Sequence, residues 1–219
     1  MSNPAMLKHQ LKFCALNQGK KQDHVTGEEP GKIFHEFPGY KIRGLSTLYN
    51  ACDTTAMFLI GHYYYQKFTK DDSLKVKQRK NIERACKYII NHLNSEHLFI
   101  ESPRFCSAER FALKVTYWKD SVVINRENGE PEYPVTYTLA HIQNLKAIRC
   151  ASKLLNSSYL CIVSNKMQKA LEKLFDISLG CFYIGIDKKG PIRGISSDSL
   201  HSLFYLDLDD LSKHHINSI

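Results

Sequence analysis

Carboxyl side chains that could exchange protons stand in two long polar stretches of this 219-residue chain. Glu36 and Asp53 lie in the first stretch, and Asp120 closely follows Trp118 and Lys119 in the second. An aromatic ring beside a carboxyl removes water from it and raises its pKa, which suits a general acid. The pair Trp118 and Asp120 therefore predicts proton donation, whereas a tryptophan considered alone is more often a core residue.

Asp53 stands where a helix is expected to begin, directly before an apolar run. At that position its carboxylate would accept backbone N–H bonds as an N-cap, stay ionised, and keep a second oxygen for a ligand hydroxyl. A purely structural cap is the alternative. His35 and Glu36 either line the same cleft or pair with Lys32 and Arg43.

The composition predicts an ample core, because 43% of the residues are hydrophobic. No apolar run approaches the roughly 20 residues that span a bilayer, and the first residues lack the apolar centre of a secretory signal. The seven cysteines form no CxxC pair and are odd in number. This pattern predicts reduced thiols in a cytoplasmic protein, with neither a metal site nor another cofactor.

A net charge of +8 leaves nucleic-acid binding open as an alternative. The basic residues concentrate between Lys67 and Lys87, where helical spacing would spread them over a surface that faces solvent. We therefore favour a solvated outer helix over a nucleic-acid footprint and expect neither nucleic acid nor membrane as a partner.

Hydrophobic periodicity predicts six helices. They cover approximately residues 6–17, 53–68, 73–93, 134–155, 160–175 and 199–211. Pro134 suits the first turn of the fourth helix. The first, third and fifth helices are amphipathic, whereas the second and fourth are apolar over most of their circumference, so we expect outer and inner helices to alternate.

The links after the second and fourth helices are short, and a long loop precedes each inner helix. Up-down packing would gather these long loops at one end, with the N-termini of the inner helices. The last loop predicts a β-hairpin, with residues 181–186 and 192–196 around an Asp-Lys-Lys-Gly turn. The expected fold class is therefore all-α, with about three αα-hairpins and one small β-hairpin.

The first loop resembles a segment of bacterial glycogen-debranching and amylo-α-1,6-glucosidase-like proteins. The resemblance begins with GEEPGKI at residues 27–33, followed by His35 and Glu36. It continues in a Y-x-x-x-D-T-T turn that contains Tyr49 and Asp53. In that family this stretch leads into an inner helix of an α/α toroid.

The second loop resembles the same family at a W-K-D-S motif, residues 118–121. The family's Asp is the candidate general acid and its Trp packs near the sugar, where an aromatic face can stack on a pyranose ring. The stretch that follows matches at Gly129, Pro134, Val135 and Gln143. His141 stands where the family has Glu.

The third loop resembles the family's F-x-x-A-L-D-x-x-G hairpin and the turn after it. The matching residues are Asp187, Gly190, Ser197, His201 and Leu203. The departures are Asp198, Leu200 and Phe204, which replace Asn, Gly and Trp. His201 either contacts the ligand or is a satisfied structural residue.

The resemblance covers most of residues 7–206 and implies one incomplete (α/α)6-toroid glycosidase domain over residues 1–219. It implies inverting hydrolysis of an α-glucan or related oligosaccharide, which needs two carboxyls ~6.5–9.5 Å apart. The implied general acid is Asp120. The implied substrate-binding residues are Trp118, Lys119, Asp53, Glu36, His35 and His201.

The family's first inner helix would precede Met6, and the hairpins that carry its second carboxylate would follow Ile219. We therefore expect the chain to be inactive alone, as a truncated enzyme. The alternative is a non-catalytic carbohydrate- or protein-binding remnant of the same fold. Because the terminal hairpins would lack neighbours, homodimerisation or repacking is expected to cover their apolar flanks.

Overall fold

The computed structural model describes residues 3–117, 126 and 129–207. The helices are α1 (Pro4–Leu16), α2 (Thr54–Thr69), α3 (Ser73–Lys77), α4 (Arg79–Asn91), α5 (Thr138–Leu155), α6 (Ser158–Lys169) and α7 (Asp198–Ser202), with the 3-10 turns η1 (Pro103–Cys106) and η3 (Ala170–Leu174). The strands are β1 (Lys41–Ile42), β2 (Leu45–Ser46), β3 (Thr136–Tyr137), β4 (Phe175–Asp176), β5 (Cys181–Phe182), β6 (Gly185–Asp187) and β7 (Gly190–Ile192). The described fold is thus mostly helical, with small sheets.

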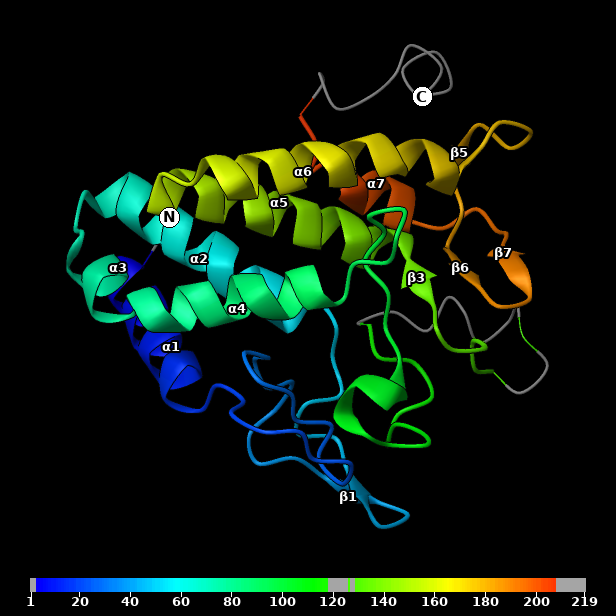
Figure 1. Cartoon of the computed structure of the whole chain (residues 1–219), viewed down its shortest axis with the longest axis horizontal. Helices are drawn as coiled ribbons and strands as arrows, with labels where there is room; N and C mark the ends of the chain where they lie inside the picture. Colours follow the sequence, from blue (N-terminus) through cyan, green and yellow to red (C-terminus); the bar gives the residue numbers. More distant parts are fainter. Residues whose placement is uncertain (1–2, 118–125, 127–128, 208–219) are drawn as a thin grey trace.

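Helices α2 and α5 pack against each other in the centre (Figure 1). Both are apolar on most sides, which is the pattern of a helix covered by neighbours on more than one face. In α5, Leu139, Ile142, Leu145 and Ile148 are almost completely buried. Their spacing of three residues drifts around the helix, so several elements must cover it: α2, α4, α6 and α7 all contact α5.

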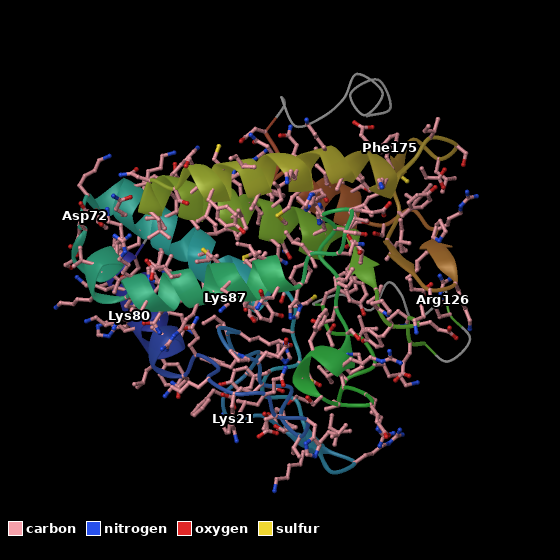
Figure 2. The ribbon with its side chains drawn as sticks, viewed as in Figure 1. Lys21, Asp72, Lys80, Lys87, Arg126 and Phe175 are labelled. Carbon is pink, nitrogen blue, oxygen red and sulfur yellow. The ribbon has the colours of Figure 1, made fainter. Side chains whose placement is uncertain are left out.

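Helices α1, α4 and α6 form the outer layer, as the amphipathic pattern predicted. In α4, Ile82, Ala85, Cys86 and Ile89 are buried on one face. Lys80 and Lys87, both labelled in Figure 2, are exposed and belong to the charged part of α4. The basic run of the sequence therefore covers the solvent-facing surface of an outer helix.

Three predicted helix boundaries were wrong, and contacts with other elements account for two of them. The third helix is divided into α3 and α4 at Gln78, whose buried Oε1 lies 2.7 Å from His62 Nε2 on α2. The fourth begins at Thr138, so Pro134 does not lie in its first turn: Val135 pairs with Glu101 and the next two residues form β3. In the sixth, α7 ends at Ser202, and the predicted continuation beyond residue 207 lies outside the described residues.

The predicted β-hairpin is present as β6 and β7, which pair from Gly185–Ile192 to Asp187–Gly190 around the two lysines of the turn. β3 joins this hairpin through antiparallel pairing of Thr136 with Ile186. The first predicted strand is shorter than expected, because Cys181 pairs back to Asp176 in a separate hairpin. The three-stranded sheet thus anchors the hairpin to the start of α5.

The three long loops gather at the end of the helical layers where α2, α5 and α7 begin (Figure 1). This arrangement follows from the short links after α2 and α5, which return the chain antiparallel. No helix among the described residues has the length and hydropathy to cross a membrane. All seven cysteines are free thiols, and five of them are buried.

Candidate functional site at the inner-helix N-termini

The GKI segment of the first loop is bound to the start of α2 by two threonines. Thr54 Oγ1 donates to the carbonyl of Ile33 at 2.9 Å, and the N–H of Ile33 donates to Thr55 Oγ1 at 2.9 Å. Both backbone groups of one buried residue are therefore satisfied by side chains of the Asp-Thr-Thr turn. This contact explains why GEEPGKI and the turn occur together: the turn fixes the loop directly beside the helix N-terminus.

The second loop reaches the same place through backbone contacts. The N–H of Cys52 donates to the carbonyl of Thr116 at 2.9 Å, and Asn144 Nδ2 on α5 donates to the carbonyl of Cys52 at 3.3 Å. Cys52 is fully buried and directly precedes Asp53. The first loop, the second loop and α5 therefore meet within one hydrogen-bond network at the start of α2.

Asp53 occupies the N-cap position of α2, but its side chain makes no capping hydrogen bond. The prediction of a side-chain cap was therefore wrong. Burial raises the pKa of the Asp53 carboxyl, and the backbone N–H groups of Asp53 and Thr54 together with the nearby His35 charge oppose this shift only in part. The carboxyl is thus free of cap bonds and has an increased tendency to hold a proton.

A buried contact joins the second loop to α7. The hydroxyl of Tyr117 donates to Asp198 Oδ2 at 3.1 Å, and both residues are buried. The Tyr117 ring stacks on Tyr137 at the start of α5, with centroids 4.5 Å apart and planes inclined by 20°. The site thus includes a second carboxyl, from Asp198, which sequence analysis treated only as a departure from the family's Asn.

His35 and Glu36 lie together on the first loop, as expected from their adjacency. His35 Nδ1 is 3.8 Å from Glu36 Oε1, and Glu36 also accepts a hydrogen bond from the hydroxyl of Thr47. Both side chains retain access to solvent, with 38% and 31% of their surfaces exposed. Neither pairs with Lys32 or Arg43, so the proposed ion pairs to those residues were wrong.

His201 lies on the short α7 helix, one turn after Ser197. Its Nδ1 is 2.8 Å from the carbonyl of Ser197, and its ring is tilted against Phe204 with centroids 6.4 Å apart. Gln143, on α5, reaches toward the same region: its Nε2 donates to the hydroxyl of Tyr205 at 3.4 Å. These contacts position both side chains locally and leave their role toward a ligand a prediction.

His141 is fully buried and has two backbone partners. The N–H of Phe99 donates to Nδ1 at 3.1 Å, so Nε2 carries the proton and donates to the carbonyl of Met167, also at 3.1 Å. Burial lowers the pKa of His141 to about 4. His141 therefore binds the second loop to α6 as a neutral ring and provides no carboxylate at the position where the family has Glu.

The GEEPGKI segment also contributes two members of a buried charge cluster. Lys32 Nζ lies 3.0 Å from Glu29 Oε1, and His92 Nε2 lies 2.7 Å from Glu29 Oε2. Burial alone would lower the pKa of Lys32, but the carboxylates of Glu101 and Glu29 outweigh it and raise that pKa. Sequence analysis missed this cluster, because charged residues are usually exposed. The cluster ties the first loop to His92, the residue that follows α4.

Three of the predicted site residues, Trp118, Lys119 and Asp120, lie outside the described residues. Among the residues that the structure does describe, no group of three or more histidine, cysteine, aspartate or glutamate side chains could hold a metal ion. The described site therefore consists of Asp53 and the Tyr117–Asp198 pair, with His35 and Glu36 on the adjoining loop.

A surface cavity of about 710 Å³ lies elsewhere. It is lined by the outer face of α4 and by residues 155–160, at the C-terminal end of α5. An 18-residue helix is about 27 Å long, so this cavity is distant from Thr138 and the long loops. Cavity size alone therefore does not identify the site, and the convergence of the loops does.

Comparison with solved structures relates this fold to a glycoside hydrolase. The chain superposes on a GH78 family rhamnosidase of Bacillus sp. GL1 with a TM-score of 0.68 and 10% sequence identity. The match covers 99% of this chain and 20% of the rhamnosidase chain, so this chain spans about a fifth of that protein's length. No family model matches the sequence, and no curated protein matches it. The described fold is therefore similar to that of a part of this rhamnosidase, and the likeness concerns the fold alone.

Proposed function

We propose that this chain is part of a glycoside hydrolase-like domain that binds an α-glucan or a related oligosaccharide at the N-termini of its inner helices. The observation that carries the proposal is the convergence of Cys52, Thr116 and Asn144 in one network beside Asp53. Aromatic faces and carboxyls at such a site suit sugar rings, which present apolar faces and rims of hydroxyl groups. The fold likeness to a rhamnosidase supports the same class of ligand.

In this proposal Asp120 is the general acid and Asp53 orients the sugar. Asp120 follows Thr116 by four positions in the sequence, and four residues span at most about 14 Å even when fully extended. The bond from Thr116 to Cys52 therefore limits how far the acid can lie from Asp53. A protonated Asp120 would give its proton to the leaving glycosidic oxygen as the bond to the anomeric carbon breaks, while a base carboxylate would activate water on the opposite face.

Within residues 1–219 the resemblance assigns no base, so we expect these residues on their own to bind saccharide with little hydrolysis. A single set of measurements separates the outcomes: isothermal titration and reducing-sugar assays with maltooligosaccharides, on wild type and Asp120→Asn. Binding without turnover in both proteins supports the proposal in its non-catalytic form. Turnover that Asp120→Asn abolishes would confirm the acid and overturn the expected inactivity.

A matched variant tests the location of the site. Asp53→Asn should weaken saccharide binding by about tenfold, because it removes an ionic acceptor for sugar hydroxyls. Asp72→Asn, at the opposite end of α2, should bind as wild type, since Asp72 pairs with Lys75 on the outer surface. Equal weakening by both variants, or no saccharide binding by the wild type, would contradict the proposed site.

A further inference from the structure

Two cavities are lined mainly by residues of the β1–β2 hairpin and of the segment 107–114. Figure 1 shows this hairpin at the lower edge of the loop layer. Their volumes are about 480 and 240 Å³. Arg43, Leu45 and Arg110 line both cavities, so an arginine from each loop borders each of them. We call the two cavities together the hollow. The hollow involves none of the residues at the start of α2 and is a separate candidate site.

Arg43 has a backbone conformation that arginine rarely adopts. Ile42 pairs with Leu45, so Arg43 and Gly44 form a two-residue turn, and both have positive φ, 51° and 83°. Turns of this kind favour Asn, Asp or Gly at the first position, because a larger side chain is strained there. A strained residue at a turn tip is a signal for a role outside folding, and here the turn presents an exposed guanidinium to the hollow.

The two guanidinium groups are available to bind an anion. Within the described part of the chain, neither Arg43 nor Arg110 forms an ion pair, although Glu109 lines the larger cavity. Lys114 adds a third cation to the lining of the smaller cavity. The cavity beside α4 differs in this respect, because its arginine, Arg79, is already paired with Glu83 at 2.9 Å.

We infer that Arg43 and Arg110 form a binding site for an anionic group, a carboxylate or a phosphate carried by a small ligand. A guanidinium presents a planar fork of donors that matches both oxyanions, and two forks from different loops can hold one anion between them. The larger cavity falls within the usual volume of small-molecule sites. The inference goes beyond the proposed function and does not depend on hydrolysis at Asp120.

The strain at Arg43 provides a sharp test. Arg43→Asn places a residue that tolerates positive φ in the turn, so we expect this variant to keep or gain thermal stability while it loses anion binding. Arg110→Gln should lose binding in the same way. Arg84→Gln is the matched control, since it removes an exposed arginine from the outer helix α4.

The intact chain is titrated with inorganic phosphate and, separately, with trigalacturonate, and binding is monitored through amide NMR shifts. Maltotriose serves as the neutral probe. Wild type and Arg84→Gln should bind at least one of the two anions with shifts at residues 42–45 and 107–114. Arg43→Asn and Arg110→Gln should weaken that binding by about tenfold or more. Binding of phosphate alone or of trigalacturonate alone identifies the source of the anionic group. Failure of both anions to bind, or equal weakening by Arg84→Gln, would overturn the inference.

Discussion

The hydroxyl of Tyr117 lies 3.1 Å from Asp198 Oδ2, a contact that joins the second loop to the first residue of α7, 81 positions later in the chain. Tyr117 is also stacked on Tyr137 at the beginning of α5. A single side chain therefore links the second loop, an inner helix and α7. The arrangement fixes the position of Tyr117, which directly precedes Trp118 in the sequence.

Tyr117→Phe should test this link without altering the stacked rings. The variant removes one donor from a buried carboxylate, which costs about 1–3 kcal/mol of unfolding free energy. Urea unfolding monitored by circular dichroism would measure the loss. Tyr40→Phe is the control, because Tyr40 is 71% exposed and should change stability little. Equal stability of Tyr117→Phe and wild type would show that the contact does not stabilise the fold.

Asp53 should make stability depend on pH in the sense opposite to an ordinary helix cap. Because burial raises the pKa of its carboxyl in the folded state, the folded chain binds this proton more tightly than the unfolded chain. Its contribution to stability is therefore fully present below the unfolded pKa and is lost as pH rises through the folded value. The stability gain of Asp53→Asn over wild type should grow between pH 4 and pH 7.

Asp23 provides a control of opposite sign for that experiment. Burial acts to raise the pKa of its carboxyl, but Lys21 and the N–H groups of Thr26 and Val25 together lower it. Stability from Asp23 is thus present above the unfolded pKa and is lost as pH falls, so Asp23→Asn should be the less stable protein at pH 7. If Asp53→Asn and Asp23→Asn changed the free energy of unfolding at pH 7 in the same direction, the assigned environment of Asp53 would be contradicted.

His141 should destabilise the fold in acid. Its pKa is lowered from 6.5 to about 4, so the unfolded chain takes up this proton first as pH falls. A shift of this size corresponds to about 3 kcal/mol, lost between about pH 6.5 and pH 4. His62, also buried, has a lowered pKa and acts in the same direction.

The measurement for His141 is unfolding free energy against pH in wild type, His141→Gln and His9→Gln. His141→Gln should lower stability at pH 7, because Phe99 or Met167 loses a partner, and should flatten the acid loss. His9 is exposed on α1, so its variant should follow the wild-type curve. A His141→Gln curve parallel to wild type would rule out the assigned pKa.

Some parts of this fold could be predicted from the sequence, and others depend on contacts that no local pattern records. Helices α2 and α5 were predictable because an apolar circumference requires burial on several sides. The beginning of α5 was not, because pairing of Thr136 with Ile186 overrides the preference of Pro134 for a helix start. For the site, the loops that converge were predictable from topology, whereas the Tyr117–Asp198 contact required the fold itself.

We propose self-association through the flank of α1, where large apolar side chains are exposed. Phe13, Phe34 and Phe37 form an edge-to-face cluster with centroids 5.3–5.8 Å apart. Leu16 and Tyr40 are more than 70% exposed on the same two segments. Sedimentation velocity should show a dimer that Leu16→Ser with Phe37→Ser converts to a monomer. Ile177→Ser, also highly exposed but on the β4–β5 turn, should remain dimeric; a monomeric wild type would refute the proposal.

Lys32 should be among the most costly residues to replace, because its removal leaves two carboxylates buried without their cation. Glu29 forms an ion pair with Lys32. Glu101 is fully buried, and its Oε2 has no hydrogen-bond partner among the described residues. Breaking one side of such a cluster typically costs about 3–5 kcal/mol.

Lys32→Met should therefore lower the free energy of unfolding by several kcal/mol. It should also loosen the first loop, because Lys32 directly precedes Ile33, the residue through which Thr54 and Thr55 bind that loop. Lys80→Met, on the exposed face of α4, should change stability by less than about 0.5 kcal/mol. Hydrogen exchange separates local from global effects: faster exchange at residues 28–36 in Lys32→Met is expected even under native conditions. If Lys32→Met is as stable as Lys80→Met, and hydrogen exchange in that loop is unchanged, then Lys32 does not stabilise the fold by compensating the buried Glu29 and Glu101.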